Sequence, residues 1–295
     1  MYQTLPRASK GAREDIYMAR ARSHRGWPTM TIGIIGTGHM GGMLAATLAE
    51  TSGERILVFN RTPEKAALVA ERHPHIAVAR GLCEIAEACD TVVICTRAAN
   101  GEQVIRDIGP RLLPKSLLLT TISTADLAAW QRLTPAIPVK MVPSLTQWAK
   151  SGVILVIYPE TADQSTKRRV EDLLRPIGRP FSIADEQVRV ASDLTSCGPA
   201  FWARLCLAWS NAAAATGALD STEAAELIRD TAVGFARLLE AGWSFAEVVD
   251  AVCVPGGVTE AGLEAFAGAE DMFAHLHRRT ARFAHGHQPE SPPGG

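Results

Sequence analysis

The chain has 295 residues, of which 47% are hydrophobic and 21% are charged. This length is enough for one large domain or two ordinary ones, and this composition is typical of a globular protein with a sizeable core. The formal net charge is −1, so no broad basic surface is expected to attract nucleic acid or an anionic membrane. Neither is therefore predicted as a partner.

The two ends of the chain differ in composition from the rest. Basic residues outnumber acidic ones in residues 1–29, which lack the apolar stretch of a secretory signal. We expect a disordered arm there, with a transit peptide as the weaker alternative and Met30 as an alternative first residue. Residues 286–295 are rich in proline and glycine and are expected to form a disordered tail.

The positions of the cysteines and histidines indicate whether disulfides or a metal site are expected. None of the six cysteines forms a C-x-x-C pair, which predicts reduced thiols in a cytoplasmic protein. The histidines near the C-terminus, such as His285 and His287, come without a cluster of cysteines or carboxylates. No metal site is therefore predicted.

In the first part of the chain, short apolar runs alternate with helical patterns. The strand-like runs are 31–36, 55–60, 91–96, 116–122, 138–142, 153–159 and 180–184. The helical patterns between the first five of these runs fall at 40–50, 63–72, 81–89, 100–108 and 125–133. Alternation of this kind predicts a parallel sheet with helices on both faces, so we assign residues 30–187 to a Rossmann-type dinucleotide-binding domain.

From residue 188 onward the pattern is helical only. The predicted helices are 190–218, 222–241, 244–252, 259–267 and 269–284. The stretch 200–219 is apolar nearly all round, so a second copy of the chain is expected to cover it. The predicted fold is therefore α/β, with an N-terminal Rossmann-type doubly wound sheet followed by an all-α dimerisation and substrate domain at 188–285.

A glycine-rich segment lies directly after the first strand and before the first helix. Its sequence is Gly36-Thr37-Gly38-His39-Met40-Gly41, a G-x-G-x-x-G fingerprint in the context that it requires. Gly36 permits the tight turn, Gly38 lets the backbone approach a pyrophosphate, and Gly41 lets the helix pack on the strand. These six residues predict a dinucleotide site.

The end of the second strand indicates which dinucleotide binds. NAD enzymes usually place an acid there for the adenine ribose, whereas this chain has Asn60-Arg61-Thr62. Arg61 could bind a 2′-phosphate, so NADP(H) is favoured over NAD(H). Alternatively, Thr62 only caps the next helix, with Pro63 in its first turn, and Arg61 faces solvent.

Two segments of the helical half limit the reactions that such a dinucleotide-binding protein could catalyse. "SCGPAF" (196–201) and "VPGGVTEAGL" (254–263) each open a predicted helix. With these segments the chain resembles the pyrroline-5-carboxylate reductases from Met30 to Phe283, and in particular the branch encoded with bacterial late-competence operons. The resemblance implies NADPH-dependent reduction of the cyclic imine 1-pyrroline-5-carboxylate to L-proline, in a homo-oligomer joined through its C-terminal helices.

The resemblance also implies roles for individual residues. Thr259 is the expected catalytic residue. The residues expected to border the substrate are Ser196, Cys197, Gly198, Gly256, Gly257 and Val258. The residues expected to line the cofactor beside the glycine fingerprint are Asn60, Arg61, Thr62, Cys95, Thr96, Arg97, Ser123 and Ser144.

The local chemistry at residues 256–259 agrees with such a role. A cyclic imine that accepts hydride needs a donor at its nitrogen and an anchor for its carboxylate, but no general base. Glycine amides at a helix start can hold a carboxylate, and the hydroxyl of Thr259 can reach the nitrogen. Simple punctuation between helices, with Thr259 as a cap, is the alternative.

The chain departs from the family at several positions. Cys197 stands in place of the central serine of G-S-G, Val254 replaces the serine before P-G-G, and Ser144 replaces an asparagine near the nicotinamide. Two alternatives follow, a non-catalytic NADP-binding regulatory homologue and a reductase of another small imine or β-hydroxy acid. The related β-hydroxyacid dehydrogenases place a catalytic lysine on the first long helix of this half, whereas residues 192–220 contain none.

Overall fold

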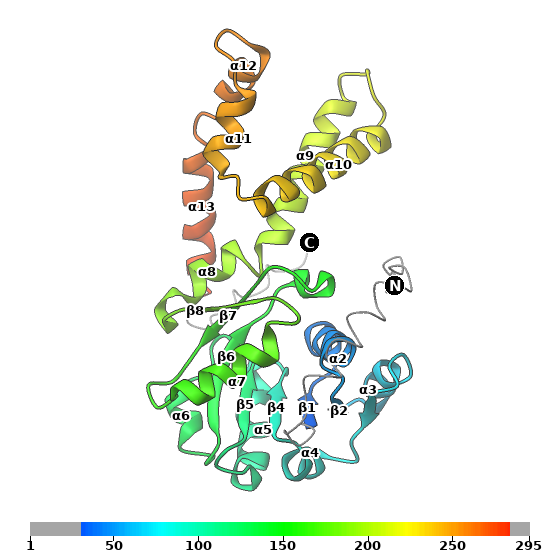
Figure 1. Ribbon diagram of the computed structural model, residues 1–295, viewed down its shortest axis with the longest axis vertical. Coiled ribbons are helices and arrows are strands. Elements are labelled where there is room, and N and C mark those ends of the chain that lie inside the picture. Colours follow the sequence, from blue (N-terminus) through cyan, green and yellow to red (C-terminus); the bar gives the residue numbers. More distant parts are fainter. Residues whose placement is uncertain (1–30, 284–295) are drawn as a thin grey trace, which may run out of the picture.

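The computed structural model describes residues 31–283, so the predicted arm at 1–29 and tail at 286–295 lie outside the described residues. Its sheet has the strand order β3-β2-β1-β4-β5-β6-β7-β8 (Figure 1). The strands are β1 (Thr31–Ile35), β2 (Arg55–Phe59), β3 (Ile76–Val78), β4 (Thr91–Ile94), β5 (Leu117–Thr120), β6 (Ile137–Val142), β7 (Val153–Ile157) and β8 (Arg179–Ser182). The order reverses between β1 and β4, which makes the sheet doubly wound, as predicted.

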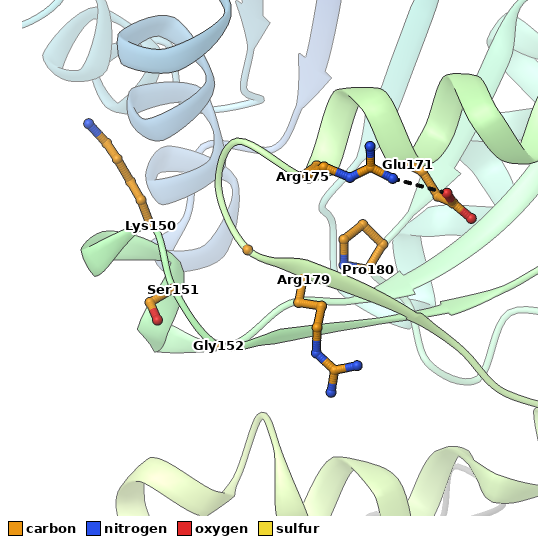
Figure 2. Close-up of a pocket in the computed structure, with 8 residues that line it drawn as sticks. Lys150, Ser151, Gly152, Glu171, Arg175, Arg179 and Pro180 are labelled. Atoms are coloured by element: carbon orange, nitrogen blue, oxygen red, sulfur yellow. Dashed lines mark hydrogen bonds and ion pairs between the residues drawn. The ribbon is translucent and has the colours of Figure 1, made fainter. Parts of the chain in front are cut away.

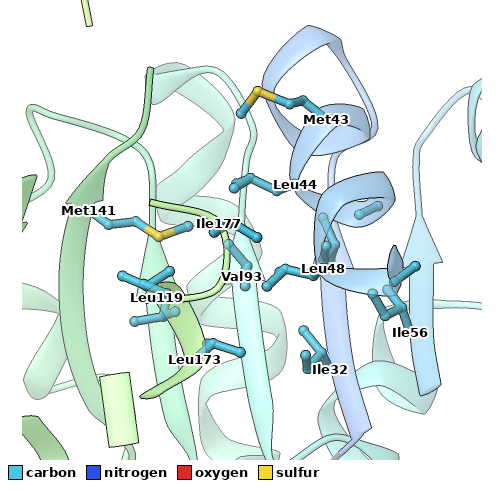
Figure 3. Close-up of a cluster of buried hydrophobic side chains, with 14 of the residues drawn as sticks. Ile32, Met43, Leu44, Leu48, Ile56, Val93, Leu119, Met141, Leu173 and Ile177 are labelled. Atoms are coloured by element: carbon cyan, nitrogen blue, oxygen red, sulfur yellow. The ribbon is translucent and has the colours of Figure 1, made fainter. Parts of the chain in front are cut away.

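Helices cover both faces of this sheet. They are α2 (His39–Ser52), α3 (Pro63–Ala70), α4 (Leu82–Ala88), α5 (Ala98–Ile108), α6 (Leu127–Gln131) and α7 (Gln164–Leu174). One buried cluster joins α2, α3 and α7 to the sheet, and Figure 3 shows Leu44, Leu48 and Leu173 meeting strand residues there. A second cluster joins α4, α5 and α6 to the opposite face. Successive strand residues alternate between the two clusters, because strand side chains point to alternate faces.

All neighbouring strands run parallel except β6 and β7, which are antiparallel. Only the short helix η2 (Leu145–Ala149) connects these two strands, and so short a connection suits an antiparallel pair. The sequence did not predict β3 or α7. β3 has three residues, too few for a periodic pattern, and α7 is mostly polar, with Val170, Leu173 and Leu174 as its buried apolar residues.

The helical half follows the short helix η3 (Asp185–Gln187). Its helices are α8 (Val188–Leu194), α9 (Gly198–Ala214), α10 (Ser221–Glu240), α11 (Phe245–Val252), α12 (Val258–Glu264) and α13 (Ala269–Ala281). The prediction of one helix over 190–218 was wrong, because α8 and α9 are separated at 195–197. Pro199 stands in the first turn of α9, where its missing N–H costs nothing and a new helix readily begins.

The helical half has almost no core of its own. Among the described residues after 187, Val188 and Ala224 are the buried hydrophobic ones. Large apolar side chains are exposed instead, with Trp202 at 62%, Trp209 at 64% and Phe245 at 67%. The α9–α10 pair and the α11–α13 stack diverge as two arms above the sheet (Figure 1). An exposed apolar surface of this extent marks an interaction site.

Between Thr31 and Phe283, no helix combines the length and the apolar character needed to cross a membrane.

Candidate cofactor and substrate site

The glycine fingerprint forms a turn between β1 and α2. Gly36 has φ +97°, and a Cβ there would approach the carbonyl oxygen of Cys95 to 2.7 Å. A Cβ on Gly41 would overlap the carbonyl oxygen of Gly36, whereas a Cβ on Gly38 would meet no atom within 4 Å. Packing therefore requires the outer two glycines. Gly38 faces open space at the start of α2, where a phosphate group fits.

Two hydroxyls at this edge of the sheet fit a dinucleotide. The hydroxyl oxygens of Thr37, after β1, and Thr96, after β4, are buried and have no hydrogen-bond partner among the described residues. A buried hydroxyl without a partner is costly in a folded protein. Since β1 and β4 are neighbours at the point where the strand order reverses, both hydroxyls lie where this fold binds dinucleotides.

Asn60 links the glycine turn to the loop after β2. Its Oδ1 accepts a hydrogen bond from the Thr37 amide at 3.1 Å, and its Nδ2 donates to the carbonyl oxygen of Thr62 at 3.0 Å. Arg61 and Thr62 are exposed, and Thr62 makes no side-chain cap bond to α3 although it is the N-cap residue. Asn60 thus holds the two loops together and leaves the Thr62 hydroxyl available to a ligand.

The remaining predicted cofactor residues lie in different environments. Burial raises the pKa of the Cys95 thiol to about 12 although a hydrogen bond to Thr121 lowers it, so this side chain is a neutral wall of the turn. Arg97 and Ser123 are exposed after β4 and β5. Ser144 is buried, and its hydroxyl donates to the carbonyl oxygen of Thr195 at 3.1 Å.

His39 and Met40 form the start of α2. His39 is exposed, and Met40 is half-buried against the core. The structure therefore brings the glycine turn, Cys95 and Thr96 together at one sheet edge, while the Ser144 hydroxyl points to the loop between α8 and α9.

In that loop, the predicted substrate residues Ser196 and Cys197 donate hydrogen bonds to α8. The Ser196 hydroxyl donates to the carbonyl oxygen of Ser192 at 3.2 Å, and the Cys197 amide donates to the same oxygen at 2.8 Å. The Cys197 sulfur lies 3.4 Å from Nη2 of Arg189. Gly198 begins α9. The half-buried Cys197 side chain is therefore held between this loop and a guanidinium group.

A buried carboxylate, which the sequence did not predict, organises this region. The Asp193 side chain is 1% exposed and accepts hydrogen bonds from Arg189 Nη2 at 2.6 Å and from the Thr280 hydroxyl. Nδ1 of His277 lies 3.0 Å from Oδ2 of the same carboxylate. Burial lowers the pKa of Arg189, but the bonds to Asp193 and Cys197 raise it above its ordinary value overall. The network ties α8 to α13 beside the loop between α8 and α9.

The Pro255-Gly256-Gly257 turn precedes α12. Gly256 has φ +72°, and its amide donates to Oε2 of Glu260 at 2.8 Å. The Gly257 amide donates to the carbonyl oxygen of Val254 at 2.8 Å. Both glycine amides are therefore engaged within the chain. Val258 is exposed.

Thr259 lies in the first turn of α12. It is half-buried, and the N-cap residue of α12 is Gly257 rather than Thr259, which counts against a simple capping role. Figure 1 shows α12 at the end of the helical arm farthest from the sheet. One chain therefore does not bring Thr259 to its own glycine turn.

A separate surface hollow of about 540 Å³ lies where β7 and β8 begin (Figure 2). Lys150 pairs with Glu50 at 2.9 Å, and Arg175 pairs with Glu171 at 3.4 Å. The Arg179 guanidinium lies 4.9 Å from the centre of the Phe181 ring. None of the predicted site residues lines this hollow, and acids partner two of its three cations.

Two family models match two separate segments of the chain. Residues 31–124 match the family described as NADP oxidoreductase, coenzyme F420-dependent. Residues 185–285 match pyrroline-5-carboxylate reductase dimerisation. Together with the sheet and the glycine turn, these matches define an NADP-dependent oxidoreductase of the Rossmann type.

Curated relatives match most of the chain. ComE operon protein 4 of Bacillus subtilis is 30% identical over 256 residues, which cover 85% of this chain and 94% of the relative. Pyrroline-5-carboxylate reductase 3 of the same organism is 26% identical over 257 residues, with the same coverage. The chain belongs to the pyrroline-5-carboxylate reductase family, which confirms the resemblance found in the sequence.

A solved structure agrees on the fold. The 1-pyrroline-5-carboxylate reductase from Streptococcus pyogenes superposes with a TM-score of 0.75 at 20% identity, covering 88% of this chain and 99% of that one.

Proposed function

We propose that this protein reduces 1-pyrroline-5-carboxylate to L-proline with NADPH. The observation that carries the proposal is that a chain of this family contains both an open glycine turn at Gly38 and the Thr259 turn before α12. A solved relative from Plasmodium falciparum, with a TM-score of 0.73 and 18% identity over 88% of this chain and 97% of that one, is described as having NADP bound.

Each part of the proposed site has a distinct role in binding or in the reaction. The amides at the start of α2 hold the pyrophosphate, and the hydroxyls of Thr37 and Thr96 gain the partners that they lack. NADPH, when bound there, would supply a hydride to the imine carbon. The Thr259 hydroxyl donates a hydrogen bond to the imine nitrogen, and that nitrogen takes up one proton from solvent as the hydride reaches the carbon, so that C=N becomes CH–NH.

We further propose that each site is shared between two chains. The Thr259 turn lies at the end of the helical arm, away from the glycine turn of its own chain. Large apolar side chains of both arms are exposed among the described residues. A second copy that packs against these arms would bury them and bring its own sheet edge to Thr259.

Turnover tests the proposed reaction directly. The purified protein is mixed with 1-pyrroline-5-carboxylate and NADPH, and the loss of NADPH absorbance is followed together with the formation of L-proline. Stoichiometric L-proline is the expected product. If NADPH binds but neither it nor the imine is consumed, the regulatory alternative replaces the proposal.

Arg61→Ala is expected to remove most of the preference for NADPH over NADH. A guanidinium bonded to a phosphate contributes about 1.5–3 kcal/mol, so the dissociation constant for NADPH should rise on the order of 10–100-fold. Fluorescence titration measures both cofactors. NADH, which has no 2′-phosphate, serves as the internal control and should bind the variant unchanged. Equal affinities in the unmutated protein would contradict the role of Arg61.

The chain is expected to form a dimer or a larger assembly through α9–α13. Light scattering at micromolar concentration should give a mass of at least two chains, because the exposed apolar faces are too large for a stable monomer. The double variant Trp202→Glu and Trp209→Glu places charges on one exposed face and should dissociate the assembly. A monodisperse monomer of the unmutated protein would rule out the shared site.

A further inference from the structure

Ser144 lies at the edge of the sheet that holds the glycine turn. Strands β1, β4, β5 and β6 are consecutive parallel neighbours, so the segments that follow them leave the sheet at the same edge. Ser144 is buried there, and its hydroxyl donates to the carbonyl oxygen of Thr195 at 3.1 Å. A serine hydroxyl has one proton to donate. In Ser144 that proton is directed to the loop between α8 and α9.

The carbonyl oxygen of Thr195 needs a donor because of the residue four positions later. In a continuous helix the N–H of residue 199 would donate to it. Residue 199 is a proline, which has no N–H and cannot make this bond. The hydroxyl of Ser144 donates to this oxygen instead. The proline that separates α8 from α9 therefore also leaves an acceptor free for a bond to the sheet edge.

The position of Ser144 is itself fixed by its neighbours. Its amide donates to Oε1 of Gln147, a fully buried side chain whose Nε2 donates to the carbonyl oxygen of Ser151 at 2.9 Å. The Ser144 hydroxyl also accepts a hydrogen bond from the amide of Thr146 at 3.4 Å. Ser144 is therefore a firm point to which the loop is attached.

The loop at 195–197 moves together with α8. The Cys197 amide, for example, donates to the carbonyl oxygen of Ser192 at 2.8 Å. The opposite end of α8 follows η3, whose Asp185 pairs at 2.5 Å with Lys140, a side chain of β6 that is 2% exposed. The β6 segment therefore holds α8 near both ends, and Ser144 holds the end that carries the loop.

We propose that Ser144 is a positioning residue that fixes the loop at 195–197 against the cofactor edge of the sheet, and that it does not itself contact the cofactor. The inference rests on the proposed imine reduction, in which this loop borders the substrate. Hydride transfer requires the reacting atoms to be held close together and aligned. A loop released from Ser144 would leave NADPH bound but would hold the substrate in the reactive geometry less often.

Ser144→Ala deletes the hydroxyl without adding any atom to the buried position. The kcat for 1-pyrroline-5-carboxylate is expected to fall about 3–10-fold, the effect of one neutral hydrogen bond, while the dissociation constant for NADPH stays within about twofold. With NADPH deuterated at the transferred position, the kinetic isotope effect on kcat should rise, because hydride transfer becomes slower relative to the other steps. A merely structural role would lower stability and leave the isotope effect unchanged.

Ser52→Ala is the matched control. The hydroxyl of Ser52 donates to the carbonyl oxygen of Leu48 at 2.8 Å within α2, so this variant loses a bond of the same kind that joins no distant segments. Its kcat, isotope effect and NADPH affinity should equal those of the unmutated protein. If the dissociation constant for NADPH rises about tenfold or more in Ser144→Ala while the isotope effect is unchanged, the serine contacts the cofactor and the inference is wrong.

Amide hydrogen exchange tests the attachment of the loop without any turnover. The amides of residues 195–198 should exchange on the order of 10-fold faster in Ser144→Ala than in the unmutated protein or in Ser52→Ala. Equal exchange in the three proteins overturns the inference, whatever the kinetics show. Absence of turnover in the unmutated protein overturns the proposed reaction instead, and the exchange rates alone then decide whether Ser144 holds the loop.

Discussion

Thr259→Val is expected to lower kcat/KM for 1-pyrroline-5-carboxylate on the order of 10²–10³-fold, the usual cost of removing one preorganised transition-state donor. Valine keeps the shape of threonine and deletes only the hydroxyl. Two departures from the family pattern cannot take over the hydrogen bond to the imine nitrogen, because Val254 is apolar and Cys197 is a weak donor. Steady-state kinetics with saturating NADPH measures the effect.

A matched threonine provides the control for this substitution. Thr161 is exposed in the loop between β7 and α7, outside the helical arms, and Thr161→Val should leave turnover within threefold of the unmutated protein. The affinity for NADPH and the mass of the assembly should be unchanged in Thr259→Val, because the proposed role of the hydroxyl is only to donate to the imine nitrogen. If the Thr259 variant keeps turnover within a few-fold, its role is limited to starting α12.

Gly38→Val is expected to abolish NADPH binding while the fold survives. The backbone at Gly38 has φ −70° and ψ −163°, which valine adopts readily, and a Cβ there meets no protein atom within 4 Å. The unfolding free energy should therefore change by less than about 0.5 kcal/mol. Valine would fill the space beside the amides of α2, so the dissociation constant for NADPH should rise on the order of 100-fold or more.

Gly41→Val is the matched comparison three residues away. A Cβ at Gly41 overlaps the carbonyl oxygen of Gly36, so α2 must move away from β1. This variant should lose about 3 kcal/mol of stability or more. Thermal unfolding followed by circular dichroism separates the two outcomes. A destabilised Gly38→Val, or a Gly38→Val that binds NADPH normally, would show that this open space is not the phosphate site.

The cofactor half could be predicted because its signals are local. The glycines, the strand before them and the helix after them form one continuous segment. The residue types in it are set by steric requirements within the same segment. The short strand β3 and the polar helix α7 carried no such signal. They form because the rest of the sheet offers them backbone partners and apolar cover.

The substrate half was harder, because its contacts join distant segments. Asp193 and His277 are 84 residues apart, and no periodic pattern connects them. The only local hint was an arginine and an aspartate four residues apart in an apolar stretch, a spacing that more often marks a surface pair on a helix. Likewise, the sequence showed that Gly256 could offer an amide, but the structure was needed to show that Glu260 already holds it.

The distance between α12 and the glycine turn of the same chain has a genetic consequence for pairs of mutant alleles. If each site is shared, a chain with a defective Thr259 turn inactivates the site that uses the glycine turn of its partner. Its own glycine turn still forms a working site with an intact Thr259 turn from the partner. Two alleles damaged in different halves would then restore one working site in each mixed pair. Two alleles damaged in the same half would restore none.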